Sequence, residues 1–475
     1  MITLAPYTAS AALNERRGCE VAVGAGVLLS LLMLAGLRWP YLWLGMAAVI
    51  GVAALFWAAR YTAKHPIWLP CALLLIEIVP SATVFDESVR PFLRYPLLFL
   101  FCLPAFPTRW RNTMLLRGGF RLYLVYFALA LFSVTYSIAP EYSLSRVVSS
   151  VLLFGAVYTL SQNIKDEWDL RRLFGVLWVA CCVILAGLAA SLVVLPSDLT
   201  WEVPNQWSDA SVVRFAGFLT PNQVGEVALP MIATGVLFWK AATRGVRIGI
   251  TASIVVAILF AVMADSRSSL VAVAIGLVVL TFDRYRWRAA AAWLLLLVLA
   301  VGGASLLSPD KLEYLNRGDV KTLTGRADIW RFTLSKIKDS PILGYGYEVE
   351  GQIFQDRHFP LREEMWDQGP HIAVHSGYLA RAVGLGVPSL LLWLFFTLRP
   401  MVGIFRGLPD YFRVRDAILI GALPVLILNL DESAASDCRY SVGILLIFVW
   451  CIAERSRLLA EDRRRLVGHS NVKSP

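Results

Sequence analysis

Four arginines and one histidine occupy places where an apolar chain would ordinarily carry uncharged side chains. Arg214 and Arg267 lie among small polar residues just before apolar runs, Arg146 begins another run, and Arg326 opens an amphipathic segment. His375 stands where the polar stretch "HIAVHSG" passes into a long apolar run. Arginine near hydrocarbon is costly unless it pairs or reaches water, and snorkelling to the interface can explain any one of them alone.

As a set, these residues suit a phosphate-bearing ligand. The guanidinium is always charged and grips phosphate oxygens in a forked geometry. A lipid-linked sugar places its diphosphate where its tail enters the bilayer, and fixed arginines would stabilise the lipid diphosphate as it leaves. His375 titrates in the range needed to take the proton of an attacking hydroxyl. His358 and His371 compete for that role, and a structural histidine at a helix start is the simpler alternative.

Two further residues are candidates for orienting the site. Asn222 follows Arg214 closely, and Glu432 in "NLDES" could orient His375 or an arginine, or could belong to a solvated loop pair. No D-x-D motif of metal-dependent glycosyltransferases occurs, and the seven cysteines show no metal-ligand spacing. The metal-dependent alternative is therefore weak.

The elements that must position these residues are predicted to be membrane helices. The chain is 57% hydrophobic and 16% charged, whereas soluble domains are nearer half apolar and a quarter charged. Long apolar runs recur along the whole chain, and the first has no removable signal-peptide layout. We expect an all-α polytopic protein with about 12 to 14 transmembrane helices. The runs lie near 20–37, 40–58, 66–81, 91–106, 119–138, 145–162, 172–195, 221–239, 248–264, 267–282, 289–307, 373–398, 416–430 and 441–454.

Basic residues predict the orientation of these helices. They gather in alternate loops, which the positive-inside rule assigns to the cytoplasm together with both termini. The net charge of +10 is therefore no sign of nucleic-acid binding, because it is not concentrated on one soluble module. The basic segments are 107–121, 240–247, 284–288, 399–415 and the tail after 454.

This orientation divides the chain into five expected parts. The loop 308–372 is the largest outward piece, too long for a simple connector, and "TGRADIWRFTLSKIK" within it predicts a short amphipathic helix beside an aromatic turn at Gly344–Tyr347. The turn is expected to serve packing.

The five expected parts are N-terminal helices (1–138), helices with arginine-bearing outward loops (139–307), the large loop (308–372), C-terminal helices (373–454) and a basic tail (455–475).

Around the candidate site residues, the sequence resembles the O-antigen ligase and Wzy-type polysaccharide polymerase superfamily. Four stretches carry the resemblance, in family order: "RFAGFLTPNQVG", "ADSRSSLVAVAIGLVVL", "LTGRADIWRFTLSKIKDSPILGYGY" and "HSGYLARAVGLGVPSLLL". The ligase pattern His-(Ser/Asn/Gln)-x9-Gly-x2-(Gly/Thr/Tyr) is met by His375, Ser376 and Gly386, but Ser389 takes its last place. The "TGRADIW…SPILGYGY" run and "NLDES" resemble exopolysaccharide polymerases of the Wzy type more closely, so the polymerase branch is preferred.

The resemblance implies an inverting, metal-independent glycosyltransferase of the bacterial inner membrane, with its active site on the periplasmic side. Its donor would be an undecaprenyl-diphosphate-linked glycan. The acceptor would be another lipid-linked repeat in a polymerase, or lipid A–core in a ligase, and a chain-length regulator is an open partner. By carry-over, His375 is the candidate base or acceptor positioner, and Arg214 and Arg267 would hold the diphosphate, with Arg326 and Arg146 as helpers. The resemblance implies no metal or nucleotide cofactor.

A transporter of lipid-linked oligosaccharides or solutes is the alternative from another class. It predicts two related halves and charges near mid-bilayer. No repeat is visible, and intramembrane charge is sparse, with Glu77 and Glu226 the main cases. The large outward loop also favours the enzyme.

Overall fold

The structure is a computed structural model that describes most of the chain after residue 112. The described ranges are 113–195, 201–202, 214–264, 266–285, 288, 326–354, 374–406, 412, 414–430 and 441–471, with isolated residues between 57 and 101. Several predicted features lie outside these ranges. They are the first four apolar runs almost entirely, the run 289–307, Glu432, His358 and His371.

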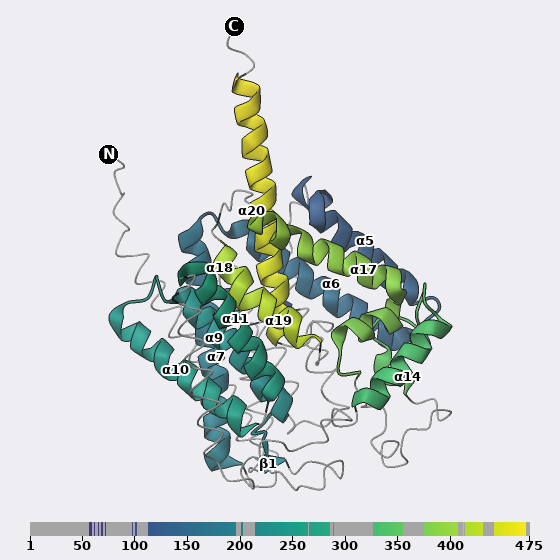
Figure 1. The fold of residues 1–475 in the computed structure, drawn as a ribbon, viewed down its shortest axis with the longest axis horizontal. Helices are drawn as coiled ribbons and strands as arrows, with labels where there is room; N and C mark the ends of the chain where they lie inside the picture. The colour runs from purple at the N-terminus through teal and green to yellow at the C-terminus, as the bar shows by residue number, and fades with distance from the viewer. Residues whose placement is uncertain are drawn as a thin grey trace.

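Helices make up nearly all of the described chain, as Figure 1 shows. They follow the predicted apolar runs, because each run is long enough to hold a helix across hydrocarbon. The elements are η3 (Thr113–Leu116), α5 (Gly118–Ser133), α6 (Pro140–Asn163), α7 (Glu167–Val194), β1 (Trp201–Glu202), β2 (Arg214–Phe215), α9 (Pro221–Phe238), α10 (Arg244–Met263), α11 (Arg267–Tyr285), α14 (Arg326–Asp339), α15 (Glu350–Ile353), α17 (Gly377–Phe405), α18 (Arg415–Ala417), the π-helical turn η5 (Ile418–Ala422), α19 (Leu423–Leu428) and α20 (Ser441–Asn471).

The predicted fold class, an all-α polytopic membrane protein, is confirmed. Within the described residues, four helices are long and apolar enough to cross a membrane: α6, α7, α10 and α17. The strands β1 and β2 form a single antiparallel contact in which Trp201 faces Phe215 and Glu202 faces Arg214. The total number of crossings rests partly on residues that the structure does not describe.

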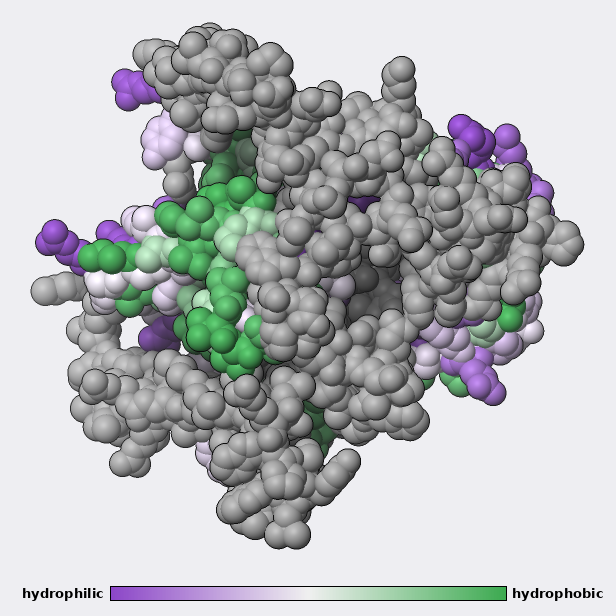
Figure 2. All heavy atoms as spheres, turned by 90° about the horizontal axis from the view of Figure 1, so that it is seen from below, coloured by the Kyte–Doolittle hydropathy of each residue, from purple (hydrophilic) through white to green (hydrophobic). Residues whose placement is uncertain are grey.

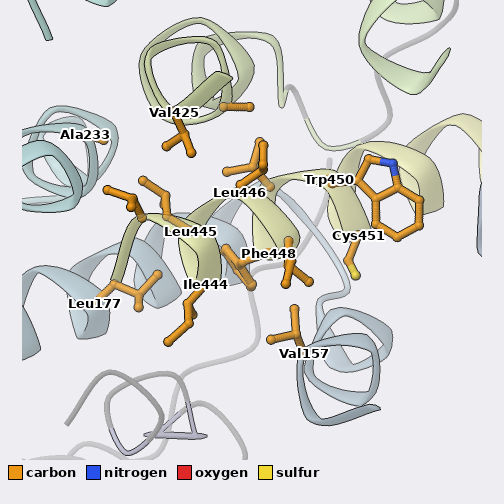
Figure 3. Packing of buried hydrophobic residues seen from close by; sticks show 14 of the residues in the cluster. Val157, Leu177, Ala233, Val425, Ile444, Leu445, Leu446, Phe448, Trp450 and Cys451 are labelled. Atoms are coloured by element: carbon orange, nitrogen blue, oxygen red, sulfur yellow. The ribbon is translucent and has the colours of Figure 1, made fainter. Parts of the chain in front are cut away.

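Helix α20 forms the centre of the packed interior. Figure 3 shows its side chains Ile444, Leu445 and Phe448 among residues of the surrounding helices α6, α7, α9 and α19. Residues 444–453 of α20 are all buried. An α-helix that is apolar on every side is stable only when it is surrounded, so this sequence places α20 in the core.

Helices α10 and α17 instead present apolar side chains outward. Val255, Leu259 and Val262 on α10 and Leu391 and Phe395 on α17 are exposed. Figure 2 shows a continuous hydrophobic area among the described residues of one face, with hydrophilic side chains toward the left and right margins. Such a surface is costly in water and suits contact with lipid.

Candidate functional site

Arg214 ties together the ends of three elements. It begins β2, its Nε donates to the carbonyl oxygen of Ala264 at the end of α10 (2.9 Å), and its Nη2 donates to Asn222 Oδ1 at the start of α9 (3.0 Å). A capping box between Thr220 and Gln223 starts α9 just before Asn222. The structure therefore places Asn222 beside Arg214, where an orienting residue was expected from the sequence.

Arg267 lies close in the chain to Ala264, whose carbonyl Arg214 binds, at the short connection between α10 and α11. It is the first residue of α11 and is exposed. The starts of α9 and α11 touch, because a Cβ on Gly225 would lie only 1.9 Å from Ser266 Oγ. The N-terminal ends of two helices thus meet beside two arginines. Helix N-termini carry partial positive charge and free N–H groups, so this end favours an anion.

His375 stands in a turn that neighbouring helices hold on both sides. Its φ is +50°, a left-handed conformation that is unfavourable for most residues with a side chain. The Val374 carbonyl before it accepts a hydrogen bond from Trp330 Nε1 (2.9 Å), and the Gly377 N–H after it donates to the Asn429 carbonyl (3.0 Å). The strained backbone is therefore fixed by α14 and α19.

Arg326 and Arg146 border the packed unit that contains this turn. Arg326 opens α14, one turn before Trp330. Arg146 on α6 donates to the Tyr142 hydroxyl (2.6 Å) and stacks over its ring (4.4 Å). Both helices pack on a second hydrophobic cluster, made of Ile329, Phe332, Val349, Ile353, Phe354, Val374, Ala380 and Val383 with Tyr142 and Trp330 at its edge.

The predicted aromatic turn supports a break in α17. Gly386 has a φ of +79° inside the helix. The backbone groups exposed by this break bond to the turn: Tyr345 N–H to Val383 O (3.0 Å), Gly346 N–H to Gly384 O (2.8 Å) and Val387 N–H to Pro341 O (2.8 Å). Broken backbone at membrane depth is tolerated only where protein satisfies it. The SPILGYGY and GLGVP sequences therefore form one structural unit.

The turn is further fixed against helices α5 and α6. The Tyr347 N–H donates to Ser133 Oγ (3.0 Å), and its hydroxyl donates to Ser150 Oγ (3.1 Å). Burial, to which the Asp339 carboxylate adds, raises the pKa of Tyr345. These contacts agree with the packing role expected for the turn.

The two groups of candidate residues lie at the same end of the helix bundle. Helices α11 and α19 pack side by side, and Arg415, just ahead of η5 and α19, bonds to Asp283 near the last turn of α11. Gly276 in mid-α11 meets Pro424, so the two helices are antiparallel. Arg267, which begins α11, and Asn429, which ends α19, consequently share the opposite end. Asn429 carries the His375 turn, so α19 lies between the arginines and the histidine.

A buried charged cluster beside this end was missed in the sequence analysis. Arg381 on α17 is 8% exposed, bonds to the Tyr126 hydroxyl and stacks over Trp393 (4.3 Å). Buried Glu348 (φ +56°) and Glu350 line the same small cavity. A charge inside the apolar run "YLARAVGLG" was the available signal, because intramembrane charges mark functional or tightly packed sites. Within the described ranges, no three His, Cys, Asp or Glu side chains gather as a metal site requires.

This fold and site define a polytopic membrane protein with cationic helix ends and a strained histidine turn at one face. Residues 218–394 match the family model Wzy_C, described as O-Antigen ligase. The match covers less than half of the chain but contains Asn222, Arg267, Arg326 and His375. It confirms the resemblance to the O-antigen ligase and Wzy-type superfamily and supports a membrane ligase or polymerase that joins glycans. No curated protein matches the chain.

Proposed function

We propose that this protein is a glycosyltransferase that takes glycan from undecaprenyl diphosphate and polymerises exopolysaccharide or O-antigen repeat units. The observation that carries the proposal is that the Arg214–Asn222 pair, Arg267 and the His375 turn lie at the same end of the bundle. Guanidinium groups at helix N-termini suit a diphosphate, and an imidazole at the same end suits an acceptor hydroxyl.

In the proposed reaction, His375 takes the proton of the acceptor hydroxyl. The hydroxyl oxygen attacks the anomeric carbon of the donor sugar, and the bond from that carbon to the diphosphate oxygen breaks. The electron pair of this bond leaves with the lipid diphosphate. Attack from the face opposite the leaving group inverts the anomeric centre. Arg214 and Arg267, with Arg326 and Arg146 as helpers, stabilise the leaving charge, and Asn222 keeps the Arg214 fork in place.

The test is chain growth in liposomes. Purified protein with a lipid-linked repeat unit should produce longer glycans, and His375→Asn should lower the rate about 10²- to 10⁴-fold, the usual range for losing a general base. Asparagine is the replacement of choice because it tolerates a left-handed backbone. His65→Asn, at an exposed position, is the matched control and should leave the rate unchanged. Undiminished growth in His375→Asn would remove the proposed base.

O-antigen ligase is the second candidate, because that is the description of the matching family. Ser389 is buried in α17 at the position where the ligase pattern has Gly, Thr or Tyr, which favours the polymerase. Supplying lipid A–core beside the lipid-linked repeat separates the two. A polymerase extends glycan on the lipid carrier, whereas a ligase transfers it to lipid A–core. Translocation of the donor without any glycan transfer would instead favour a transporter.

A further inference from the structure

The connection between α14 and α15 exposes two large apolar side chains at its tip, residues 341–343. Ile342 is 70% exposed and Leu343 is 51% exposed. The backbone at the tip is fixed, because the Pro341 carbonyl accepts a hydrogen bond from the Val387 N–H just after the break in α17 (2.8 Å). The pair is therefore held outward, and the neighbouring helices indicate what covers it.

The tip adjoins a lipid-facing stripe on α17. This helix is one of the described helices that are long and apolar enough to cross a membrane. After the break, Leu391, Phe395 and Leu398 are exposed, and their spacing of three or four residues places them on one face of the helix. A helix that crosses the bilayer turns such a face to the acyl chains. Val387, which is bonded to the tip, lies one turn before Leu391 on the same face.

Helix α5 brings a second apolar stripe to the same tip. Its exposed side chains Val125, Leu129 and Phe132 recur at helical spacing. Tyr136, one turn further on, contacts the Phe132 ring edge to face (5.8 Å between centroids) and donates from its hydroxyl to the Leu343 carbonyl (2.8 Å). Tyrosine is enriched at the boundary between membrane and water. Since α5 and α17 pack side by side, both stripes end at the tip.

The break in α17 also lies near the edge of the hydrocarbon layer. Residues 387–405 are about 28 Å long at 1.5 Å per residue, which is close to the hydrocarbon thickness of about 30 Å. Before the break, Ala380 and Val383 pack in the second hydrophobic cluster with α14 and α15, whereas Trp393 and Phe396 after it pack in the main core. The tip is bonded at this transition.

Charged residues stand just ahead of the tip. Lys336, Lys338 and Asp339 occupy the last turn of α14. Both signs are present, so this turn suits the polar headgroup layer without selecting one headgroup. Long lysine side chains can reach the headgroups while apolar neighbours lie deeper. The argument for a lipid partner thus comes from the two apolar stripes and not from charge.

We propose that the tip inserts into the bilayer leaflet on the His375 side, with Ile342 and Leu343 among the acyl chains. Part of the segment predicted as an outward loop is then a membrane anchor. The turn behind the tip is bonded to α17 on both sides of its break, so insertion fixes the depth of the helix start that follows His375. This inference does not depend on glycan transfer.

The first experiment places the photoreactive amino acid p-benzoylphenylalanine at position 342 of the full chain in phosphatidylcholine liposomes. After irradiation, the mass of the intact protein reports covalent phospholipid adducts. Position 391 in the α17 stripe is the positive control. Position 464 is the negative control, because Arg464 is exposed on the part of α20 that projects beyond the bundle (Figure 1). The adduct yield at 342 should match that at 391 and exceed that at 464 at least about tenfold, as the apolar transfer free energy predicts.

The second experiment introduces a charge at the tip. Ile342→Asp should lower the midpoint of thermal unfolding in the same liposomes by about 2–4 °C, whereas Ile342→Phe should leave it unchanged. Asn163→Asp is the matched control, since Asn163 is exposed at the opposite end of α6, and it should also unfold at the wild-type temperature.

Two results would overturn the proposal. The first is irradiation at 342 that joins two copies of the protein, or gives no lipid adduct while position 391 gives one. The second is an Ile342→Asp variant as stable as the wild type, because a tip in water would tolerate the carboxylate.

Discussion

His375 combines an ionisable ring with an unusual backbone, and the two properties can be separated by substitution. Its φ of +50° is held by the Trp330–Val374 and Gly377–Asn429 hydrogen bonds. Asparagine and glycine adopt this conformation easily, whereas a β-branched residue does not. We predict that His375→Asn unfolds at the wild-type temperature and that His375→Val loses about 1–3 kcal/mol. Thermal unfolding in detergent measures this difference.

Both substitutions remove the imidazole, so both should lower the rate of glycan transfer about 10²- to 10⁴-fold. The comparison thereby distinguishes the loss of a base from the loss of the fold. Equal stability of the asparagine and valine variants would contradict the left-handed conformation on which this prediction rests.

We predict that the role of Arg214 depends on the forked geometry of its guanidinium group and not only on its positive charge. It bonds to Ala264 O and Asn222 Oδ1 through two different nitrogen atoms, which a lysine cannot reproduce. Arg214→Lys should therefore destabilise the protein by about 1 kcal/mol and slow glycan transfer in liposomes. Arg331→Lys is the control, since Arg331 is largely exposed and its exchange should change stability by less than about 0.5 kcal/mol. Similar effects of the two exchanges would refute the role given to the fork.

At this scale some residues could be predicted from the sequence and others could not, for a physical reason. Asn222 was expected beside Arg214 because the two are close along the chain, and the structure places them in contact. Arg381 was missed because its partners, Tyr126 and Trp393, are spread over two helices, and their meeting depends on tertiary packing. Whether His375 and the arginines bind substrate stays a prediction.

The break in α17 and the aromatic turn should behave as one element. A Cβ on Gly386 would lie 2.0 Å from the Ile342 carbonyl oxygen, and its φ of +79° is unfavourable for other residues. We predict that Gly386→Ala destabilises the protein by at least about 1–3 kcal/mol and lowers activity, because α17 carries His375 at its start. The midpoint of thermal unfolding in detergent gives this value.

Gly245→Ala provides the matched control. Gly245 lies in the first turn of α10, and no neighbouring atom lies within 4 Å of the place that an alanine Cβ would take. Alanine should therefore be neutral or stabilise by up to about 1 kcal/mol. If alanine were tolerated equally at both glycines, the break would not depend on the turn.

Elements were easier to predict than their contacts. Helices α6, α7, α10 and α17 follow from apolar length alone, and α14 follows from the spacing of Trp330, Leu334 and Ile337. The break at Gly386 could not be predicted in this way. Its partners at Pro341–Gly346 lie some forty residues earlier, and no local pattern reveals a long-range backbone pairing.

For the molecule as a whole, Glu454 ties α20 to the start of α5 and also forms a buried ion pair within α20. Glu454 accepts from the Gly119 N–H (2.7 Å) and from Arg457 (2.6 Å), with the two side chains 0% and 4% exposed. Glutamine at this position loses the charge that pairs with Arg457, while Arg457 keeps its second ion pair with Glu461. We predict that Glu454→Gln destabilises the protein by about 1–3 kcal/mol, measured by thermal unfolding.

Asp462→Asn tests whether burial causes this loss. Asp462 of the same helix pairs with Arg117 just before α5, but both side chains are about a third exposed. Exposed pairs contribute about 0–1 kcal/mol, so this variant should be nearly as stable as the wild type. Comparable losses for Glu454→Gln and Asp462→Asn would contradict the importance given to burial.

The whole arrangement places two arginines, two helix N-termini and the His375 turn at one end of the bundle. The most direct test is an experimental structure of the protein with an undecaprenyl-diphosphate-linked sugar bound. We predict diphosphate oxygens within about 3 Å of the Arg214 or Arg267 guanidinium nitrogens, with the anomeric carbon facing the His375 ring. A diphosphate bound at the opposite end of the bundle, or out of reach of both arginines, would contradict the account.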